Sequence, residues 1–154
     1  MEGEVSQKLL FIEKGVFRYY LLHDGKDYSK DFAIDCYNPF CTGYSSFIYQ
    51  EPSLINIEAL EESVVLEWNV KYINKLFRTY PWILFAKKMA DSLYRRKEKR
   101  EVSFLKDSAE TRYNELLNEY PELIQRVPQY HIASYLGIAP ESLSRIRRLR
   151  SRRP

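Results

Sequence analysis

Apolar and polar residues alternate over much of the first 68 residues, and this period of two predicts β-strands. Strand-like runs occupy residues 9–12, 16–22 and 28–34, and the pattern returns over 54–60 and 63–68. The segment His23-Asp24-Gly25-Lys26 predicts a tight hairpin, because Asp-Gly tolerates the positive φ that such a turn requires. Five or six antiparallel strands suit a sandwich or barrel, here one that is incomplete on its N-terminal side.

After Trp68 the apolar positions recur every three or four residues, which predicts helices. Asn69 is a plausible N-cap for a helix that runs to Tyr80, where Pro81 stops it. A longer helix is expected over 82–105. Its apolar stripe is narrow and suits pairing with a second helix; it consists of Trp82, Ala86, Met89 and Leu93. The alternative is a helix that lies on its own domain, but the β region is too small to cover its whole length.

The last quarter of the chain has the pattern of a helix, a sharp turn and a second helix. Before it, Asp107 with Glu110 fits a capping box that opens a helix ending at Pro121. Gly137 then supplies the turn after an apolar helix face. Pro140 suits the first position of the second helix, where its fixed φ and missing N–H cost nothing. This spacing is typical of a helix-turn-helix, whose second helix enters the DNA major groove.

The second helix has one apolar face, formed by Leu143 and Ile146, and one polar face. The polar residues can hydrogen-bond base edges or phosphates, and the candidate DNA-binding residues are Glu141, Ser142, Ser144, Arg145, Arg147 and Arg148. The competing interpretation is a glycine that merely separates two surface helices.

Charge is concentrated beside this helix. The whole chain has a net charge of only +3, yet six arginines fall within residues 145–153. A basic cluster next to a recognition helix is the electrostatic pattern expected of a phosphate-binding surface. The alternative is a solvated basic tail.

Composition limits the remaining possibilities. With 154 residues, of which 45% are hydrophobic, the chain can form one or two small domains with a core. Thirteen tyrosines and eight phenylalanines favour a β-rich part. No apolar run approaches the roughly 20 residues that span a bilayer, and the first residues, MEGEVSQ, do not resemble a signal peptide. We therefore expect a soluble, cytoplasmic protein.

The residues that could carry chemistry are few. Cys36 and Cys41 are too few for an all-thiolate iron–sulfur cluster within one chain, and ordinary thiols are simpler than a cluster shared by two chains. His23 and His131 have no second ligand at metal spacing, so both are expected to be structural or solvent-facing. No catalytic constellation or phosphate loop is present, so neither an enzyme nor a cofactor is expected.

The order of these parts resembles that of the Crp/Fnr family of bacterial transcription regulators. The resemblance rests on KLLFIEKGVFRYYLLHDGK, IEALEESVVLEW and RVPQYHIASYLGIAPESLSRIRR, which look most like members from Bacteroides-type bacteria. It implies an α+β fold: a partial antiparallel β-roll of the cyclic-nucleotide-binding type over 1–80, a long dimerisation helix over 81–106, and a winged-helix-like helix-turn-helix domain over 107–154.

The resemblance also implies roles for single residues. Glu141 and Arg145 match the recognition-helix residues that contact base edges, and Ser142 matches a phosphate contact. Pro140 replaces an arginine found in many relatives, so the operator should differ. The effector-pocket positions correspond to Gly43, Ser45, Ser53 and Leu54. Because no arginine stands there to neutralise a phosphate, we expect no tight cyclic-nucleotide binding.

The leading expectation is a homodimer that binds double-stranded DNA at an inverted repeat, with RNA polymerase and an unknown small-molecule effector as further partners. The alternative is a β-roll sensor or protein-interaction dimer that has lost specific DNA binding. Relatives have further residues before Glu2, which indicates either a fragment or an internal start. The β-wing is expected to be short or missing, because the sequence ends just past the recognition helix.

Overall fold

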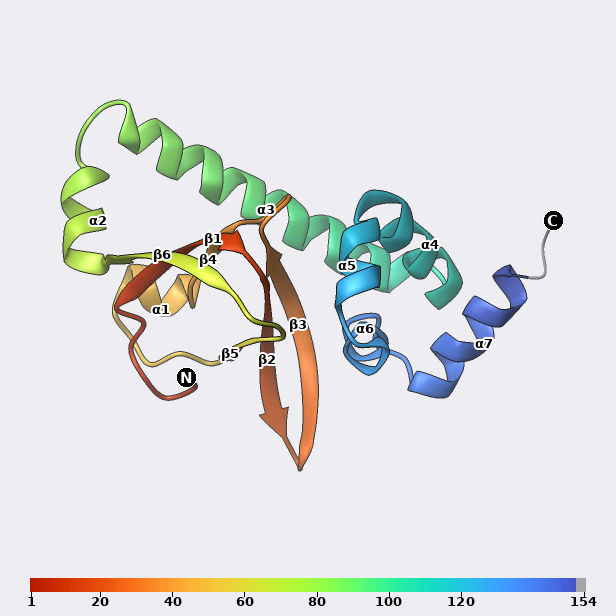
Figure 1. Ribbon diagram of the computed structural model, residues 1–154. Helices are drawn as coiled ribbons and strands as arrows, with labels where there is room; N and C mark the ends of the chain where they lie inside the picture. Colours follow the sequence, from red (N-terminus) through yellow and green to blue (C-terminus); the bar gives the residue numbers. More distant parts are fainter. Residues whose placement is uncertain (152–154) are drawn as a thin grey trace.

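The structure, a computed structural model, describes residues 1–151 and combines two antiparallel sheets with a set of helices (Figure 1). The sheets have the strand orders β4-β1-β6 and β3-β2-β5. The strands are β1 (Lys8–Lys14), β2 (Val16–His23), β3 (Lys26–Ile34), β4 (Phe40–Cys41), β5 (Asn56–Ala59) and β6 (Val64–Asn69). The α+β class and the β-roll architecture expected from the sequence are confirmed.

Strands β2 and β3 form the expected hairpin, paired from Val16 opposite Ile34 to His23 opposite Lys26. Asp24 and Gly25 make the two-residue turn, with φ values of 49° and 71°. Positive φ at both positions is what a type I′ turn needs, and its twist matches that of the two strands. The hairpin extends beyond the other strands (Figure 1).

The two faces of this hairpin have different neighbours, because successive side chains of a strand point to opposite faces. Val16, Phe32 and Ile34 belong to a core shared with the C-terminal helices. Phe17 and Tyr19 belong to a second core, which also contains Ile12 of β1 and lies between the two sheets. The hairpin therefore separates the β-roll interior from the helical part, and each of its faces packs against one of them.

The helices are α1 (Tyr44–Tyr49), α2 (Val70–Leu76), α3 (Trp82–Lys106), α4 (Ala109–Glu119), α5 (Pro121–Arg126), α6 (Gln129–Tyr135) and α7 (Pro140–Arg150). Asn69 caps α2 as expected, since its side chain accepts from the Lys71 N–H. The helix ends earlier than the expected Tyr80, because the chain leaves it after Leu76 and the Thr79 hydroxyl donates to the Leu76 carbonyl at 2.8 Å.

The expected capping box at Asp107 is wrong. Asp107 ends α3 instead, with its N–H donating to the Ser103 carbonyl. The next residue, Ser108, is the N-cap of α4, and its hydroxyl accepts from the Thr111 N–H at 3.1 Å. The N-cap lies one residue later than expected, because Asp107 and Ser108 are the two residues between the helices and the first of them ends α3.

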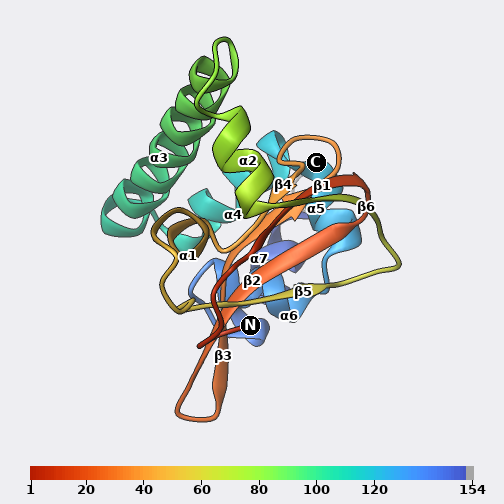
Figure 2. The same ribbon diagram turned by 90° about the vertical axis from the view of Figure 1, so that its left-hand side faces the viewer.

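Helix α3 is 25 residues long, or about 37 Å at the usual rise per residue. It lies along one side of the molecule, beside α2 at its N-terminal end (Figure 2). Ser103 is the one residue of α3 that is buried. None of the helices within residues 1–151 combines the length and apolar character needed to cross a membrane.

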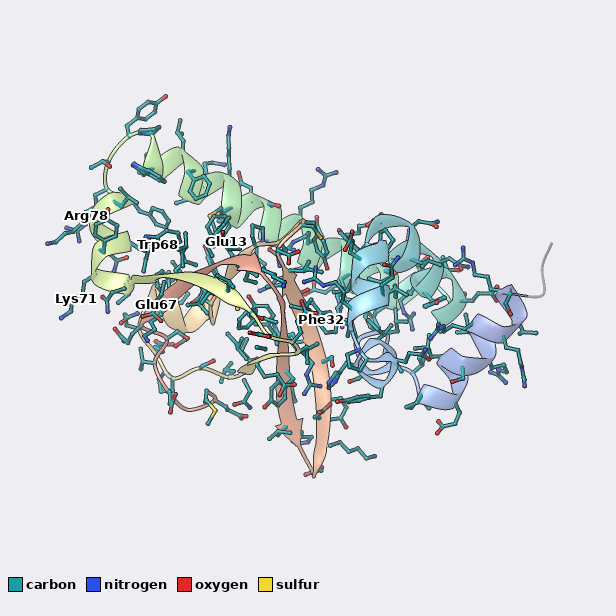
Figure 3. The ribbon with its side chains drawn as sticks, in the orientation of Figure 1. Glu13, Phe32, Glu67, Trp68, Lys71 and Arg78 are labelled. Atoms are coloured by element: carbon teal, nitrogen blue, oxygen red, sulfur yellow. The ribbon has the colours of Figure 1, made fainter. Side chains whose placement is uncertain are left out.

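The helical part sits directly on the β-hairpin. Phe32 of β3, labelled in Figure 3, lies in the core shared with the C-terminal helices. Its ring centroid is 5.4 Å from that of Tyr135 on α6. Nearby, the Arg126 guanidinium donates two hydrogen bonds of 2.9 Å to the Asp35 carboxylate, joining α5 to the end of β3. These contacts fix the orientation of α6 relative to the sheet.

Candidate nucleic-acid interface

A tight turn joins α6 to α7. Gly137 has a φ of 69°. Its N–H donates to the Ser134 carbonyl and the Ile138 N–H donates to the Ala133 carbonyl, both at 3.0 Å. This pair of bonds is the Schellman motif, which satisfies the carbonyls at the end of a helix.

Glycine is required at this position for two reasons. Its positive φ is one that residues with a Cβ rarely adopt. In addition, a Cβ built on Gly137 would lie 2.8 Å from the Phe104 ring of α3, which is too close. The turn is therefore pressed against the long helix.

Helix α7 is attached through one apolar face. Pro140 occupies its first turn, as expected, and Ala139 provides no side-chain cap. Leu143 is only 1% exposed and belongs to the core that contains Ile132 and Leu136. Ile146, three residues further along, packs against the same core. This burial leaves the opposite side of α7 open.

The open side of α7 collects four of the six expected DNA-binding residues. Glu141, Ser144, Arg145 and Arg148 are exposed, and their spacing of three and four residues places them on one face. Ser142 and Arg147 are half-buried and flank this face. None of the salt bridges within residues 1–151 uses a residue of α7, so these charges are available to a ligand. Arg152 and Arg153 of the expected basic tail lie outside the described residues.

The charges also follow the direction of the helix dipole. Glu141 stands in the first turn of α7, whereas Arg147, Arg148 and Arg150 stand in the last. Each position is favourable, because the N-terminal end of a helix attracts negative charge and the C-terminal end attracts positive charge. The result is an ordered surface with a carboxylate acceptor at one end and guanidinium donors at the other.

Sequence reasoning missed Arg18, which connects the β-roll to α6. Arg18 of β2 is 2% exposed, and His131 of α6 is equally buried. The Arg18 guanidinium donates to Asp27 and Glu58 and contacts Nδ1 of His131. An arginine in the middle of an apolar strand was the available signal, because a buried charge needs partners. The expectation that His131 is structural agrees with its burial, whereas His23 is exposed at the hairpin tip.

The space between α3 and the sheets contains a cavity of about 480 Å³. Apolar side chains, including Phe40, Phe47 and Met89, line much of it, and Lys30, Arg96 and Lys97 add positive charge. Burial lowers the pKa of the Lys30 ammonium, and the charges of Lys97 and Arg100 lower it further. An apolar molecule with an anionic group would therefore suit this cavity.

The four expected effector-pocket residues lie close to the cavity but do not line it. Gly43 and Ser53 are buried, and the Ser53 hydroxyl donates to the Ile55 carbonyl. Ser45 and Leu54 are exposed. Their neighbours Thr42, Tyr44 and Ile55 line the cavity instead.

The stripe expected to mediate dimerisation faces the β-roll over most of its length. Ala86, Met89 and Leu93 line the cavity, and Trp82 at the start of α3 is 42% exposed. The exposed apolar residues of α3 lie elsewhere on the helix and include Ile83, Leu84, Tyr94, Val102 and Leu105.

The cysteines form no centre that could bind a metal. Cys36 is exposed and Cys41 is buried, and both are free thiols. Burial raises the pKa of the Cys41 thiol to about 11. Within residues 1–151, no group of three or more His, Cys, Asp and Glu side chains is placed to hold a metal ion.

No protein-family model and no curated protein matches the sequence. Solved structures do match. FixK2 from Bradyrhizobium japonicum gives a TM-score of 0.77 at 18% identity, over 96% of this chain and 76% of that chain. The c-di-GMP-responsive global regulator CLP from Xanthomonas campestris gives 0.71 at 15% identity, over 97% of this chain and 80% of that chain.

A transcriptional regulator assigned to the Crp/Fnr family, from Eubacterium rectale, gives a TM-score of 0.68 at 19% identity. The match covers 95% of this chain and 69% of that one. A CooA mutant from Carboxydothermus hydrogenoformans is similar over 66% of its own length, with a TM-score of 0.67. The β-roll, the long helix and the helix-turn-helix thus occur together in the order found in these proteins, and the fold of this chain is that of the Crp/Fnr transcription regulators.

Proposed function

We propose that this chain is a Crp/Fnr-type transcription regulator that reads DNA sequence with α7. The observation that carries the proposal is the polar face of α7, which is exposed and makes no ion pair within residues 1–151, while Leu143 holds the opposite face in the core. A recognition helix needs both properties: one face that packs firmly on the protein core, and an opposite face whose donors and acceptors are available to DNA. The likeness to known transcriptional regulators supports the same function.

The proposed reading mechanism assigns a chemical role to each group. The Arg145 guanidinium can donate two hydrogen bonds to O6 and N7 of a guanine, and the Glu141 carboxylate can accept from N4 of a cytosine. Ser142, Arg147 and Arg148 lie beside or beyond these residues and would contact phosphates, which position the protein without reading sequence. Two copies of the chain would place two α7 helices about 34 Å apart, on successive major grooves of an inverted repeat.

The test compares Arg145→Ala with the control Arg78→Ala. Arg78 is also exposed, but it lies between α2 and α3, far from α7 (Figure 3). In an anisotropy titration against the promoter of its own gene, we expect Arg145→Ala to lose about 1–3 kcal/mol of binding free energy and to discriminate less at one base position. Arg78→Ala should bind as the wild type does. Equal affinity of the wild type for promoter and scrambled DNA would contradict the proposal.

We propose further that the cavity between α3 and the sheets is an effector site for an apolar molecule that ends in an acid group. Its apolar lining and the positive charges of Lys30, Arg96 and Lys97 support this choice. Decanoate should raise the melting temperature more than decanol, and Lys30→Met should remove the difference. Cyclic AMP should give a smaller shift than decanoate, because the mostly apolar lining leaves the polar groups of a nucleotide without partners. A shift with cyclic AMP alone would exclude this ligand class.

A further inference from the structure

Arg18 and His131 are the centre of a polar cluster where the β-roll meets the helix-turn-helix. We call it the Arg18 cluster; it consists of Arg18, Asp27, Ser29, Glu58 and His131. The Arg18 side chain donates to Glu58 at 2.8 Å and to the two oxygens of Asp27 at 3.0 and 2.9 Å. Its Nη1 also contacts Nδ1 of His131 on α6. Both central residues are 2% exposed.

The chemistry of this contact fixes the protonation state of His131. An arginine side chain only donates hydrogen bonds, so Nδ1 of His131 must accept one. The imidazole is therefore neutral, with its proton on Nε2. Protonation at Nδ1 would remove the acceptor and place two N–H groups and two positive charges against each other in a buried site.

The groups around His131 act in opposite directions. Asp27 of β3 and Glu58 of β5 favour the charged imidazole, whereas burial and Arg18 of β2 disfavour it. Burial and Arg18 prevail, so the pKa of His131 lies below its ordinary value of 6.5. On its own helix, the Tyr130 ring stacks beside the imidazole at 3.8 Å between centroids.

A second polar contact fixes the same helix to the same hairpin. The Ser29 N–H of β3 donates to the Ser134 hydroxyl of α6 at 2.9 Å. Ser134 lies three residues before Gly137, and its carbonyl accepts the bond that closes the turn into α7. Because this turn is tight, the orientation of α6 determines that of α7, whose polar face stays uncovered.

We propose that the contact between neutral His131 and Arg18 is a proton-sensitive latch that holds the helix-turn-helix in one orientation on the β2–β3 hairpin. His131 is a positioning residue, because it acts on DNA reading only through α6 and α7. The consequence for DNA rests on the proposed function. The folded pKa of His131 is lowered, so the contact is intact at neutral pH and weakens as the pH falls below about 6.5.

The experiment uses the two histidines of the chain, one in the latch and one outside it. His131→Asn keeps an oxygen acceptor close to the position of Nδ1 but does not titrate. His131→Gln is a second acceptor variant, in case the shorter amide disturbs folding. His23→Asn removes the exposed histidine at the hairpin tip and is the matched control. The primary readout is hydrogen exchange of β3 and α6 peptides without DNA, corrected for intrinsic rates, at about pH 7.5 and about pH 5.5.

In the wild type and in His23→Asn, protection of these peptides should fall by up to about tenfold between the two pH values, because an imidazole released from the contact titrates near its ordinary pKa of 6.5 and favours the open form at the lower pH. His131→Asn or His131→Gln should keep its protection at both values. Unchanged protection in the wild type, or an equal loss in both His131 variants, would overturn the latch.

A DNA titration at fixed salt then separates the two proposals. If both hold, promoter affinity should fall at low pH in the wild type and remain constant in the acceptor variants. A pH-dependent change in protection without specific DNA binding supports the latch and refutes only the proposed function. Specific DNA binding with pH-independent protection refutes only the latch.

Discussion

Single residues decide how the turn between α6 and α7 is built. Two arginines from other helices donate to the last carbonyls of this segment: Arg100 of α3 to the Tyr135 carbonyl at 2.9 Å, and Arg112 of α4 to the Leu136 carbonyl at 3.0 Å. Gly137 follows, in contact range of Phe104. Helix-end carbonyls need such partners, so the turn depends on α3 and α4 as well as on its own sequence.

Two glycines of positive φ allow the contribution of the Phe104 contact to be measured. Gly137→Ala and Gly25→Ala both force a Cβ into the left-handed region, at φ values of 69° and 71°. The Cβ at position 25 meets open space, whereas that at position 137 meets the Phe104 ring. Gly25→Ala should therefore cost about 1–2 kcal/mol, and Gly137→Ala should cost at least about 1 kcal/mol more.

Urea denaturation followed by circular dichroism gives both values. Equal losses would mean that Phe104 moves aside freely.

Predictions based on local sequence performed well at this scale: the roles of Gly137, Asn69 and Pro140 are as expected. They failed where two adjacent residues could each be the N-cap, as with Asp107 and Ser108. They also failed where the interaction partner is far away in the sequence, as for Arg18.

Ion pairs join elements that are distant in the sequence. Arg126 of α5 binds Asp35 after β3 and also Glu61 before β6. The Asp35 carboxylate accepts in addition from the Gly15 N–H at 2.8 Å. The guanidinium of Arg126 and this N–H lower the pKa of Asp35 to about 2, against an ordinary value of 3.8. This site thus fastens the helical part to the hairpin.

The sign of the pH dependence follows from that shift. Because the folded pKa of Asp35 is lowered, its stabilisation is present above about pH 4 and is lost as the pH falls towards 2. The lost stability should be about 2 kcal/mol. Asp35→Asn should be less stable than the wild type at neutral pH and should show a smaller further loss on acidification.

The matched control is Asp91→Asn, since Asp91 pairs with Lys87 on the exposed surface of α3. Such pairs contribute little, so this variant should follow the wild type across the acid range. Urea midpoints at pH values between about 3 and 6 would measure the difference, and parallel curves for Asp35→Asn and the wild type would refute the assignment.

At the scale of elements, periodicity predicted the type and order of nearly every helix and strand. It did not predict which face of α3 packs inward. Ala86, Met89 and Leu93 satisfy the pattern of a pairing seam, but the same pattern serves a helix that lies over its own sheets. Only the position of the β-roll decides between the two, and no local sequence feature records it.

For the whole molecule, the main feature is a single core that joins the β-roll to the C-terminal helices. The core contains Val16 and Phe32 from the sheet together with Leu116, Ile132 and Leu143 from three different helices. From the sequence alone we expected the β-roll and the C-terminal helices to be separate segments. The contacts that join them, such as that between Arg18 and His131, connect residues 113 positions apart. Such distant pairings cannot be derived from periodicity or capping signals.

The expected dimer belongs to the scale of the whole molecule. We expect pairing through the exposed apolar residues of α3, so Leu105→Glu should shift the chain from dimer to monomer in sedimentation experiments. Leu105 is 88% exposed, and its replacement should leave the fold unchanged. Leu54→Glu, at a site that is 83% exposed in the segment between α1 and β5, is the control and should remain dimeric. A wild-type monomer at micromolar concentration would contradict the prediction.

The β2–β3 hairpin has a consequence for how such a protein diverges. Tyr19 faces the cavity while its neighbour Arg18 faces α6, so adjacent positions of one strand belong to different tasks. Substitutions that adapt the cavity to a new compound leave the anchoring of α6 untouched, and the reverse also holds. One backbone still carries both sets of side chains, so the lining of the cavity and the anchoring of α6 can change separately and yet remain mechanically connected.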